Sequence, residues 1–225
     1  MTEDVANPYS RRAQDMLVRP DVLEQVSDLL RAFDQATIAS HTDELTKIPN
    51  RAGVIHYGDQ IIKNLKAIRT ELQGISGLPD DFIYLGERQV AAFSIDLVGL
   101  KRENEKAGHA AGNKLIISVA EALKATFQRD TDLYGHLGGD DFVAFAFNVK
   151  EEVIQLLTEK LLSKLPKGVQ IYVVVQMLKL NDQTAMEEIS AIAEENIEMA
   201  KIKVDKDENG RLVNGGTVCL PTITL

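Results

Sequence analysis

The pattern of apolar and polar positions predicts alternating helices and strands along most of the chain. Amphipathic helices are expected first, over about residues 22–37 and 51–72, because their apolar side chains recur three or four positions apart. Residues 89–98 form a nearly continuous apolar run, which is typical of a buried central strand. The expected order is helix, helix, strand, two helices, two strands joined by a hairpin, helix, strand, helix and strand. This order predicts an α/β sandwich with a mixed central sheet flanked by helices, ferredoxin-like in its middle.

The first predicted helix carries a narrow apolar stripe at 3-4-3 spacing, formed by Leu23, Val26, Leu30 and Phe33. Such a stripe suits a helix that packs on its own domain, and it equally suits a short coiled-coil seam between two copies. We expect residues 1–42 to form an N-terminal helical arm and residues 43–225 to form one larger domain. In the tail, Asn214-Gly215 is a dipeptide typical of tight turns, so residues 210–225 are expected to form a terminal hairpin.

Composition narrows the classes of function. The 225-residue chain has a net charge of −9, so it has no basic field for a nucleic-acid duplex. Its only cysteine, Cys219, excludes a disulfide framework and a cysteine-rich zinc site, which suits a reducing cytoplasm. No apolar run approaches the roughly 18 residues of a membrane span. We therefore expect a cytoplasmic protein with no membrane span and no nucleic-acid partner.

Carboxylates stand at two informative positions. Asp96 ends the buried strand, where a charge is costly unless it is paired or bound to a metal. Gly138-Gly139-Asp140-Asp141 forms the predicted hairpin turn. The ordinary alternatives are a helix-capping aspartate and a polar turn. On neighbouring central strands, Asp96 and Asp140 would lie side by side and form a hard-cation site suited to two-metal phosphoryl or nucleotidyl transfer.

Four short motifs stand in order between about residues 43 and 201. They are Asp43-Glu44-Leu45-Thr46 with Asn50-Arg51; then Asp96, Lys101, Asn104, Gly108-His109 and Gly112; then Gly138 to Phe142; and finally Ala200-Lys201. In this order and spacing they resemble the GGDEF family of diguanylate cyclases. The resemblance implies a fold like the palm of nucleotidyl cyclases. It also implies that the chain condenses two molecules of GTP into cyclic di-GMP and releases pyrophosphate.

The resemblance further assigns roles to individual residues. It implies that Asp96, the Leu97 carbonyl and Asp140 hold two divalent metals, Mg²⁺ or Mn²⁺. It makes Asp140 and Asp141 the catalytic candidates, with Asp140 able to help deprotonate the attacking hydroxyl. The substrate-binding candidates are Lys101, Asn104, Asn113, Gly138, Gly139 and Lys201. Among these, Asn104 would read guanine, and the two lysines would neutralise phosphate charge.

The same resemblance implies assembly and regulation. Each domain holds one GTP, so catalysis would require a homodimer, and the helix over residues 22–37 is the candidate to control it. Arg129 and Asp132 have the R-x-x-D form of the family's inhibitory site for cyclic di-GMP, where arginine can bond guanine bidentately. An exposed Arg–Asp turn pair without a ligand is the ordinary alternative. An upstream signalling protein is a further candidate partner.

Several positions depart from the family pattern. Asp141 replaces glutamate, Val98 replaces a second strand-end aspartate, and His136 replaces an arginine. Asn113 replaces an aspartate that accepts two hydrogen bonds from guanine, and asparagine has only one acceptor oxygen. Selectivity for GTP over ATP should therefore weaken. These departures support an alternative function, a catalytically degenerate module that acts as a receptor for GTP or cyclic di-GMP. The presence of both metal carboxylates and both lysines favours an active, slow cyclase.

Overall fold

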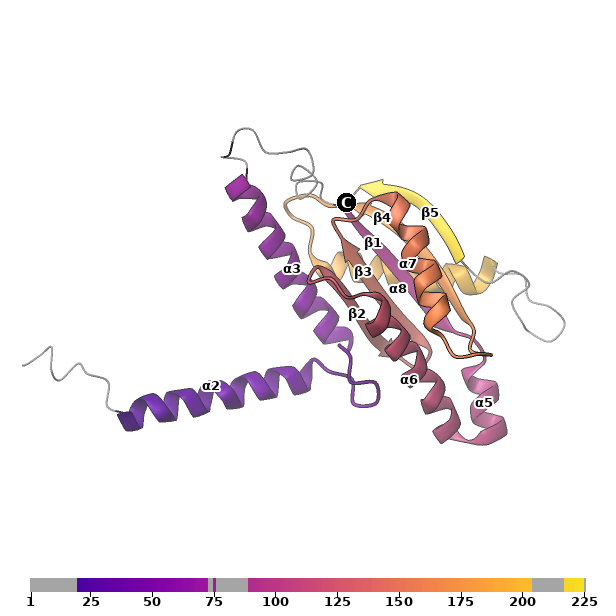
Figure 1. Ribbon diagram of the computed structural model, residues 1–225, viewed down its shortest axis with the longest axis horizontal. Coiled ribbons are helices and arrows are strands. Elements are labelled where there is room, and N and C mark those ends of the chain that lie inside the picture. Colours follow the sequence, from indigo (N-terminus) through magenta and orange to yellow (C-terminus); the bar gives the residue numbers. More distant parts are fainter. Residues whose placement is uncertain (1–19, 73–74, 76–88, 204–216, 225) are drawn as a thin grey trace, which may run out of the picture. The chain divides into compact units, whose positions relative to one another are not determined.

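Residues 20–72, 75, 89–203 and 217–224 are described by the computed structural model (Figure 1). The chain divides into two units, Met1–Ser40 and His41–Leu225. In the smaller unit, α2 (Pro20–Ser40) begins two residues before the expected start, because proline is tolerated in the first turn of a helix. Its apolar side chains Val26, Leu30 and Phe33 are exposed. No described helix combines the length and apolar character that a bilayer crossing requires.

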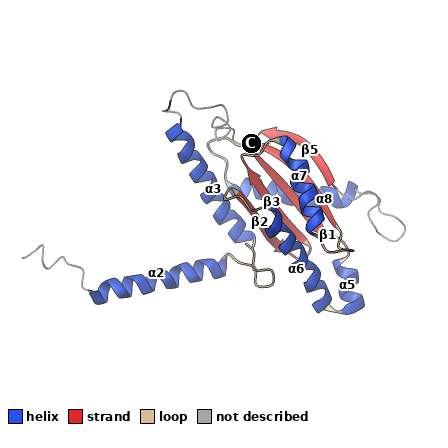
Figure 2. Cartoon of the chain, viewed as in Figure 1, coloured by secondary structure: helices blue, strands red, loops and turns tan. Residues whose placement is uncertain are grey.

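The larger unit contains the sheet and its helices in the predicted order (Figure 2). The elements are α3 (Arg51–Leu72), β1 (Gln89–Leu97), α5 (Leu100–Ala107), α6 (His109–Thr126), β2 (Asp132–Gly138), β3 (Asp141–Phe147), α7 (Glu151–Lys164), β4 (Ile171–Lys179), α8 (Met186–Lys203) and β5 (Thr217–Thr224). The five strands lie in the order β2-β3-β1-β4-β5. The predicted mixed sheet flanked by helices is therefore confirmed.

The last strand, β5, pairs with a strand that was not expected to be its partner. Strands β2, β3, β1 and β4 are antiparallel to their neighbours, but β5 pairs with β4 in parallel. A parallel pair needs a crossover connection, which α8 supplies. The turn expected at Asn214-Gly215 lies outside the described residues. The expected hairpin over residues 210–225 therefore stays a prediction, while the partner that the structure gives β5 is distant in the sequence.

Helices cover both faces of the sheet, with α6 and α7 on one face and α3 and α8 on the other (Figure 1). Side chains of β1 alternate between the two cores: Phe93 and Ile95 pack under α6, while Val90 and Ala92 pack under α3 and α8. All four are fully buried. Burial on both faces explains why the β1 sequence is almost continuously apolar rather than alternating.

The segment between α2 and α3 forms a closed loop in the larger unit. The Asn50 N–H donates to the His41 carbonyl at 3.0 Å, and the Asn50 side chain accepts the Gly53 N–H at 2.9 Å, which caps the start of α3. At Gly53, an added Cβ would lie 2.1 Å from the His41 carbonyl oxygen. Only glycine therefore allows α3 to begin this close to the loop.

Candidate functional site

Three carboxylates converge at one end of the sheet. Asp96 is the buried penultimate residue of β1, Asp140 lies in the turn after β2, and Asp141 begins β3. One ligand atom from each lies within 4.8 Å of the other two. The strand register places Asp96 directly opposite Asp141, and the Leu97 N–H donates to the Asp140 carbonyl at 2.9 Å. The structure therefore brings Asp96 and Asp140 together as expected, and it adds Asp141 to the cluster.

The two glycines before these acids shape the turn. Gly138 has φ = 124° and Gly139 has φ = 60°, conformations that residues with a Cβ rarely adopt. A Cβ added at either glycine would meet no other atom within 4 Å. The glycines are therefore required by backbone conformation and not by crowding. The space above the turn is open, so a ligand can approach the backbone closely.

A hollow of about 470 Å³ opens beside Asp140. Its lining residues are Leu100, Lys101, Asn104, Glu105, His109 and Asp140. Its size falls within the range of small-molecule sites, roughly 300–1,000 Å³. Lys101 was predicted to bind phosphate, and Asn104 was predicted to recognise guanine. The structure thus brings both residues to the same hollow as Asp140.

Close packing between α5 and α6 fixes Asn104. Its Oδ1 atom is buried and has no hydrogen-bond partner among the described residues. At Gly112, an added Cβ would lie 2.0 Å from this oxygen. Gly112 therefore leaves room for the Asn104 amide, which gives the G-H-x-x-G motif a structural role beside the site.

Two further predicted substrate residues are Asn113 and Lys201. Asn113 is exposed on α6 and is not among the residues that line the hollow. Lys201 belongs to α8, and its side chain lies outside the described residues. The contacts expected of Asn113 and Lys201 with GTP stay predictions.

Sequence reasoning missed two neighbours of the site. Glu105 lines the hollow, and Tyr172 on β4 stands opposite Asp96 in the register. Burial, together with the nearby Asp96 charge, raises the pKa of Tyr172. Nothing in the local sequence signals Tyr172, because its position beside Asp96 depends on the order of the strands.

His136 connects the turn to the loop before α3. Its buried ring stacks on Phe142, with centroids 4.6 Å apart. Its Nε2 lies 3.1 Å from the Gly139 carbonyl oxygen, and its Nδ1 lies 3.2 Å from Asp43 Oδ1. The residue that replaces the family's arginine therefore still joins the first motif to the glycine turn.

The other residues of the first motifs are held nearby. The Thr46 hydroxyl donates to Asp43 Oδ1 at 2.6 Å, and the Thr46 N–H donates to the same atom at 2.8 Å. Arg51 forms an ion pair with Glu194 of α8. The hydrogen bond to Glu194 is the main cause that raises the pKa of Arg51, and the Asp141 charge acts in the same direction. The opening motifs thus support the carboxylate cluster without lining the hollow.

The pKa of Asp43 gives a prediction for stability. Burial acts to raise this pKa, but the hydrogen bonds from Thr46 and the neighbouring His136 outweigh it and lower the pKa below its ordinary value of 3.8. A carboxyl whose pKa is lower in the folded state stabilises the fold above its unfolded pKa, and this contribution is lost as the pH falls through the folded pKa. We expect Asp43→Asn to cost about 1 kcal/mol near neutrality. The difference from wild type should shrink below pH 3.8.

Urea unfolding of both proteins across the acid range measures this difference. Asp34→Asn is the matched control, because Asp34 lies on the exposed surface of α2. A gap between wild type and Asp43→Asn that stays constant down to the acid limit would contradict the assignment.

Arg129 and Asp132 form a pre-built pair at the start of β2. The arginine donates to Asp132 Oδ1 through Nε at 2.9 Å and through Nη2 at 2.7 Å, and Nη2 also donates to the Phe147 carbonyl at 3.0 Å. The Asp132 side chain is 2% exposed, whereas that of Arg129 is 45% exposed. Asp132 therefore positions the arginine, and Arg129 is the member of the pair that a ligand can reach.

Comparison with known proteins identifies the family of the chain. The sequence model of the family described as "Diguanylate cyclase, GGDEF domain" matches residues 84–206. The match covers more than half of the chain, so the chain belongs to the GGDEF family. Over 139 residues, or 61% of the chain, it is 32% identical to the diguanylate cyclase DgcP of Escherichia coli. The chain covers 35% of that relative's length.

A second relative is the bifunctional diguanylate cyclase/cyclic di-GMP phosphodiesterase MucR of Pseudomonas aeruginosa. It is 34% identical over 145 residues, which are 64% of this chain and 18% of MucR. Among solved structures, the coiled coil and GGDEF domain of DgcB from Caulobacter crescentus, in complex with c-di-GMP, aligns with a TM-score of 0.59. The alignment covers 89% of this chain and 96% of that one at 16% identity, so it supports the fold alone.

Proposed function

We propose that this chain is a diguanylate cyclase that condenses two molecules of GTP into cyclic di-GMP. The observation that carries the proposal is the convergence of three carboxylates beside a hollow that contains Lys101 and Asn104, in a member of the GGDEF family. Each 3′-hydroxyl attacks the α-phosphate of the other GTP. A new O–P bond forms at each attack, and pyrophosphate leaves.

The chemistry of the carboxylate cluster fits Mg²⁺ or Mn²⁺. The three acids supply hard oxygen ligands within 4.8 Å of one another, which suits these cations. Asp96, Asp140 and the Leu97 carbonyl would hold the metals. Asp141 would supply a further carboxylate ligand. When bound, the cations neutralise triphosphate charge and stabilise the attacking and leaving oxygens.

The chain's own residues bind and orient the nucleotide. Lys101 lies in the hollow and neutralises phosphate charge, a role that Lys201 shares in this proposal. Asn104 presents its buried amide to the guanine edge. The open backbone of Gly138 and Gly139 lets the phosphates approach the turn. Asp140 takes the proton from the attacking 3′-hydroxyl.

Each domain holds one GTP, so the proposal requires a homodimer. In each subunit of this homodimer, residues 1–42 form an arm and residues 43–225 form the catalytic domain. The exposed apolar side chains of α2, including Val26, Leu30 and Phe33, support a second copy of this helix as the contact. An upstream signalling protein would act through the arm. The absence of a bilayer-crossing helix among the described residues is compatible with the proposed action in the cytoplasm.

Turnover of GTP with Mg²⁺ or Mn²⁺ tests the proposal. Cyclic di-GMP and pyrophosphate are expected in a ratio of one to two, and chromatography measures both. Sedimentation velocity reports the dimer in the same sample. A verified dimer that makes no cyclic di-GMP at high GTP would refute the cyclase.

Because Asn113 offers one acceptor where two would match guanine, ATP should compete with GTP unusually well, and Asn113→Asp should reduce that competition.

We further propose that cyclic di-GMP inhibits the enzyme at Arg129. The arginine is held by Asp132 and by the Phe147 carbonyl, while its outer face stays accessible. A guanidinium fixed in this way can bond the O6 and N7 atoms of guanine with little loss of side-chain entropy.

Arg129→Ala should raise the concentration of cyclic di-GMP needed for half inhibition by about tenfold to a hundredfold. Initial rates measured over a series of product concentrations give this value. Arg102→Ala is the matched control, because Arg102 is an exposed arginine on α5. Equal inhibition of wild type and Arg129→Ala would show that Arg129 does not belong to the inhibitory site.

The alternative function is a receptor for GTP or cyclic di-GMP without turnover. The pre-built Arg129–Asp132 pair supports it, since this pair is independent of the carboxylate cluster. Saturable binding of cyclic di-GMP that depends on Arg129, together with no product from a verified dimer, would establish the receptor instead of the cyclase.

A further inference from the structure

The hollow beside Asp140 extends along α5, away from the carboxylates. The Leu97 N–H donates to the Asp140 carbonyl at 2.9 Å, and α5 begins three residues after Leu97, beyond the end of the sheet (Figure 1). Lys101 and Glu105 both line the hollow, and they stand about 6 Å apart along the axis of α5. The hollow therefore has an inner end beside the carboxylates, where Lys101 stands, and an outer end, where Glu105 stands.

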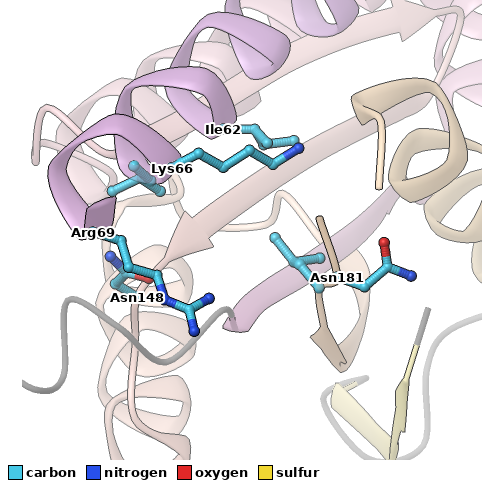
Figure 3. A pocket seen from close by; sticks show the side chains of 7 residues that line it. Ile62, Lys66, Arg69, Asn148 and Asn181 are labelled. Atoms are coloured by element: carbon cyan, nitrogen blue, oxygen red, sulfur yellow. The ribbon is translucent and has the colours of Figure 1, made fainter. Parts of the chain in front are cut away.

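The volume of this hollow suits the base of a nucleotide. It is about 470 Å³. A second hollow, whose lining includes Ile62, Arg69 and Asn148 (Figure 3), has a volume of about 30 Å³, which holds about two water molecules. Of these two hollows, the one along α5 is therefore the one that can hold a base.

Asn104 offers a hydrogen-bond donor to the hollow. Its Oδ1 atom is buried against Gly112, where an added Cβ would lie 2.0 Å from this oxygen. The amide group carries its nitrogen on the side away from its oxygen, so Nδ2 is the end that faces a ligand. This nitrogen can only donate. The O6 atom of guanine is an acceptor and matches it, whereas adenine carries a donor amine at the same position.

Glu105 offers two acceptors next to that donor. It follows Asn104 in the chain, lines the same hollow and is exposed, so its carboxylate can turn toward a ligand. An ionised carboxylate has two acceptor oxygens and no donor. Beside O6, the edge of guanine carries the donors N1–H and N2–H₂. Adenine has a bare acceptor at N1 and no amine at C2, so a carboxylate matches guanine and opposes adenine.

We propose that Glu105 determines the preference for guanine by accepting hydrogen bonds from N1–H and N2–H₂ while the Asn104 amide donates to O6. The two side chains then present donor, acceptor and acceptor, which complements the acceptor, donor and donor of the guanine edge. Asn113 offers only one acceptor, so Glu105 carries the preference that Asn113 leaves weakened. This inference rests on the proposed binding of GTP in this hollow, but it does not depend on turnover.

The test measures binding without turnover. Three ribonucleoside triphosphates that carry guanine, hypoxanthine or adenine are titrated into the full chain with Mg²⁺ and followed by calorimetry. Each has a methylene bridge between its α- and β-phosphates, so pyrophosphate cannot leave. Hypoxanthine keeps O6 and N1–H but lacks the N2 amine. Wild type should bind the hypoxanthine and adenine compounds about tenfold more weakly than the guanine compound.

Glu105→Gln should bring the ratio of the guanine and hypoxanthine affinities close to one and lower the ratio of the guanine and adenine affinities. Glutamine replaces one acceptor with a donor, which then meets N2–H₂. The lost negative charge acts alike on all three triphosphates, so the ratios cancel it. Glu103→Gln is the matched control, because Glu103 is a carboxylate of the same helix that is not among the lining residues, and its ratios should equal those of wild type.

The possible results separate this inference from the proposed cyclase. Ratios in Glu105→Gln that equal those of wild type, or the same fall in Glu103→Gln, would overturn the role of Glu105 and leave the cyclase standing. Failure of all three triphosphates to bind would overturn both. A guanine preference that depends on Glu105, together with no cyclic di-GMP from GTP, would support this inference and refute the cyclase.

Discussion

Asp96→Asn is expected to lower the rate of cyclic di-GMP formation by about a thousandfold or more. Asp96 is the most buried of the three converging acids, at 6% exposed, and it faces Asp141 across the strand pair. Asparagine keeps the shape of the side chain but removes the charge. Charge stabilisation by a bound metal is worth several kcal/mol in the transition state, and each 1.36 kcal/mol changes a rate about tenfold.

Two measurements make this result specific. Initial rates of GTP turnover give the loss of activity, and Mn²⁺ binding without nucleotide should weaken in the same variant. Glu121→Gln is the matched control, because it removes one carboxylate from the exposed surface of α6 and should leave both values unchanged. Turnover in Asp96→Asn within tenfold of wild type would show that the cluster does not hold the catalytic metals.

Gly135→Ala should destabilise the larger unit by about 3 kcal/mol. In β2, an added Cβ at this position would lie 2.2 Å from Val54 Cγ2 and 2.8 Å from the Pro49 carbonyl oxygen. Val54 is fully buried, so it has no free space into which it can move. The same carbonyl accepts the His136 N–H at 2.9 Å, so the start of α3 would have to shift away from β2.

Urea unfolding of wild type, Gly135→Ala, Val54→Ala and the double variant measures this contact. Removing the Val54 methyl groups relieves part of the overlap, so the double variant should lose less stability than the sum of the single losses. Strictly additive losses, or a loss below about 1 kcal/mol for Gly135→Ala, would show that α3 and β2 are not packed as described.

Much of the fold follows from periodicity in the sequence. The apolar run of β1 and the helical spacing of α3 predicted those elements and the order of the rest. The acids Asp96 and Asp140 could be found because one ends a buried strand and the other follows two glycines. These signals are local, so the sequence alone carries them.

Contacts that depend on strand order could not be predicted. Tyr172 stands beside Asp96 only because β4 neighbours β1, and β5 pairs in parallel with β4 despite a local turn signal. Glu105 shares the hollow with Asp140 because α5 lies next to the glycine turn. The hollow at Arg69 and Asn148 joins residues almost eighty positions apart, and neither residue belongs to a recognisable motif.

The closed loop before α3 connects the start of the larger unit to the glycine turn. Its Pro49 carbonyl holds the backbone of His136, while its Asp43 carboxylate lies 3.2 Å from the ring of the same residue. The far side of that ring touches the Gly139 carbonyl, one residue before Asp140. The His136 ring is therefore clamped between the loop that follows residue 41 and the turn that carries Asp140, so these two segments of the chain are joined by direct contacts.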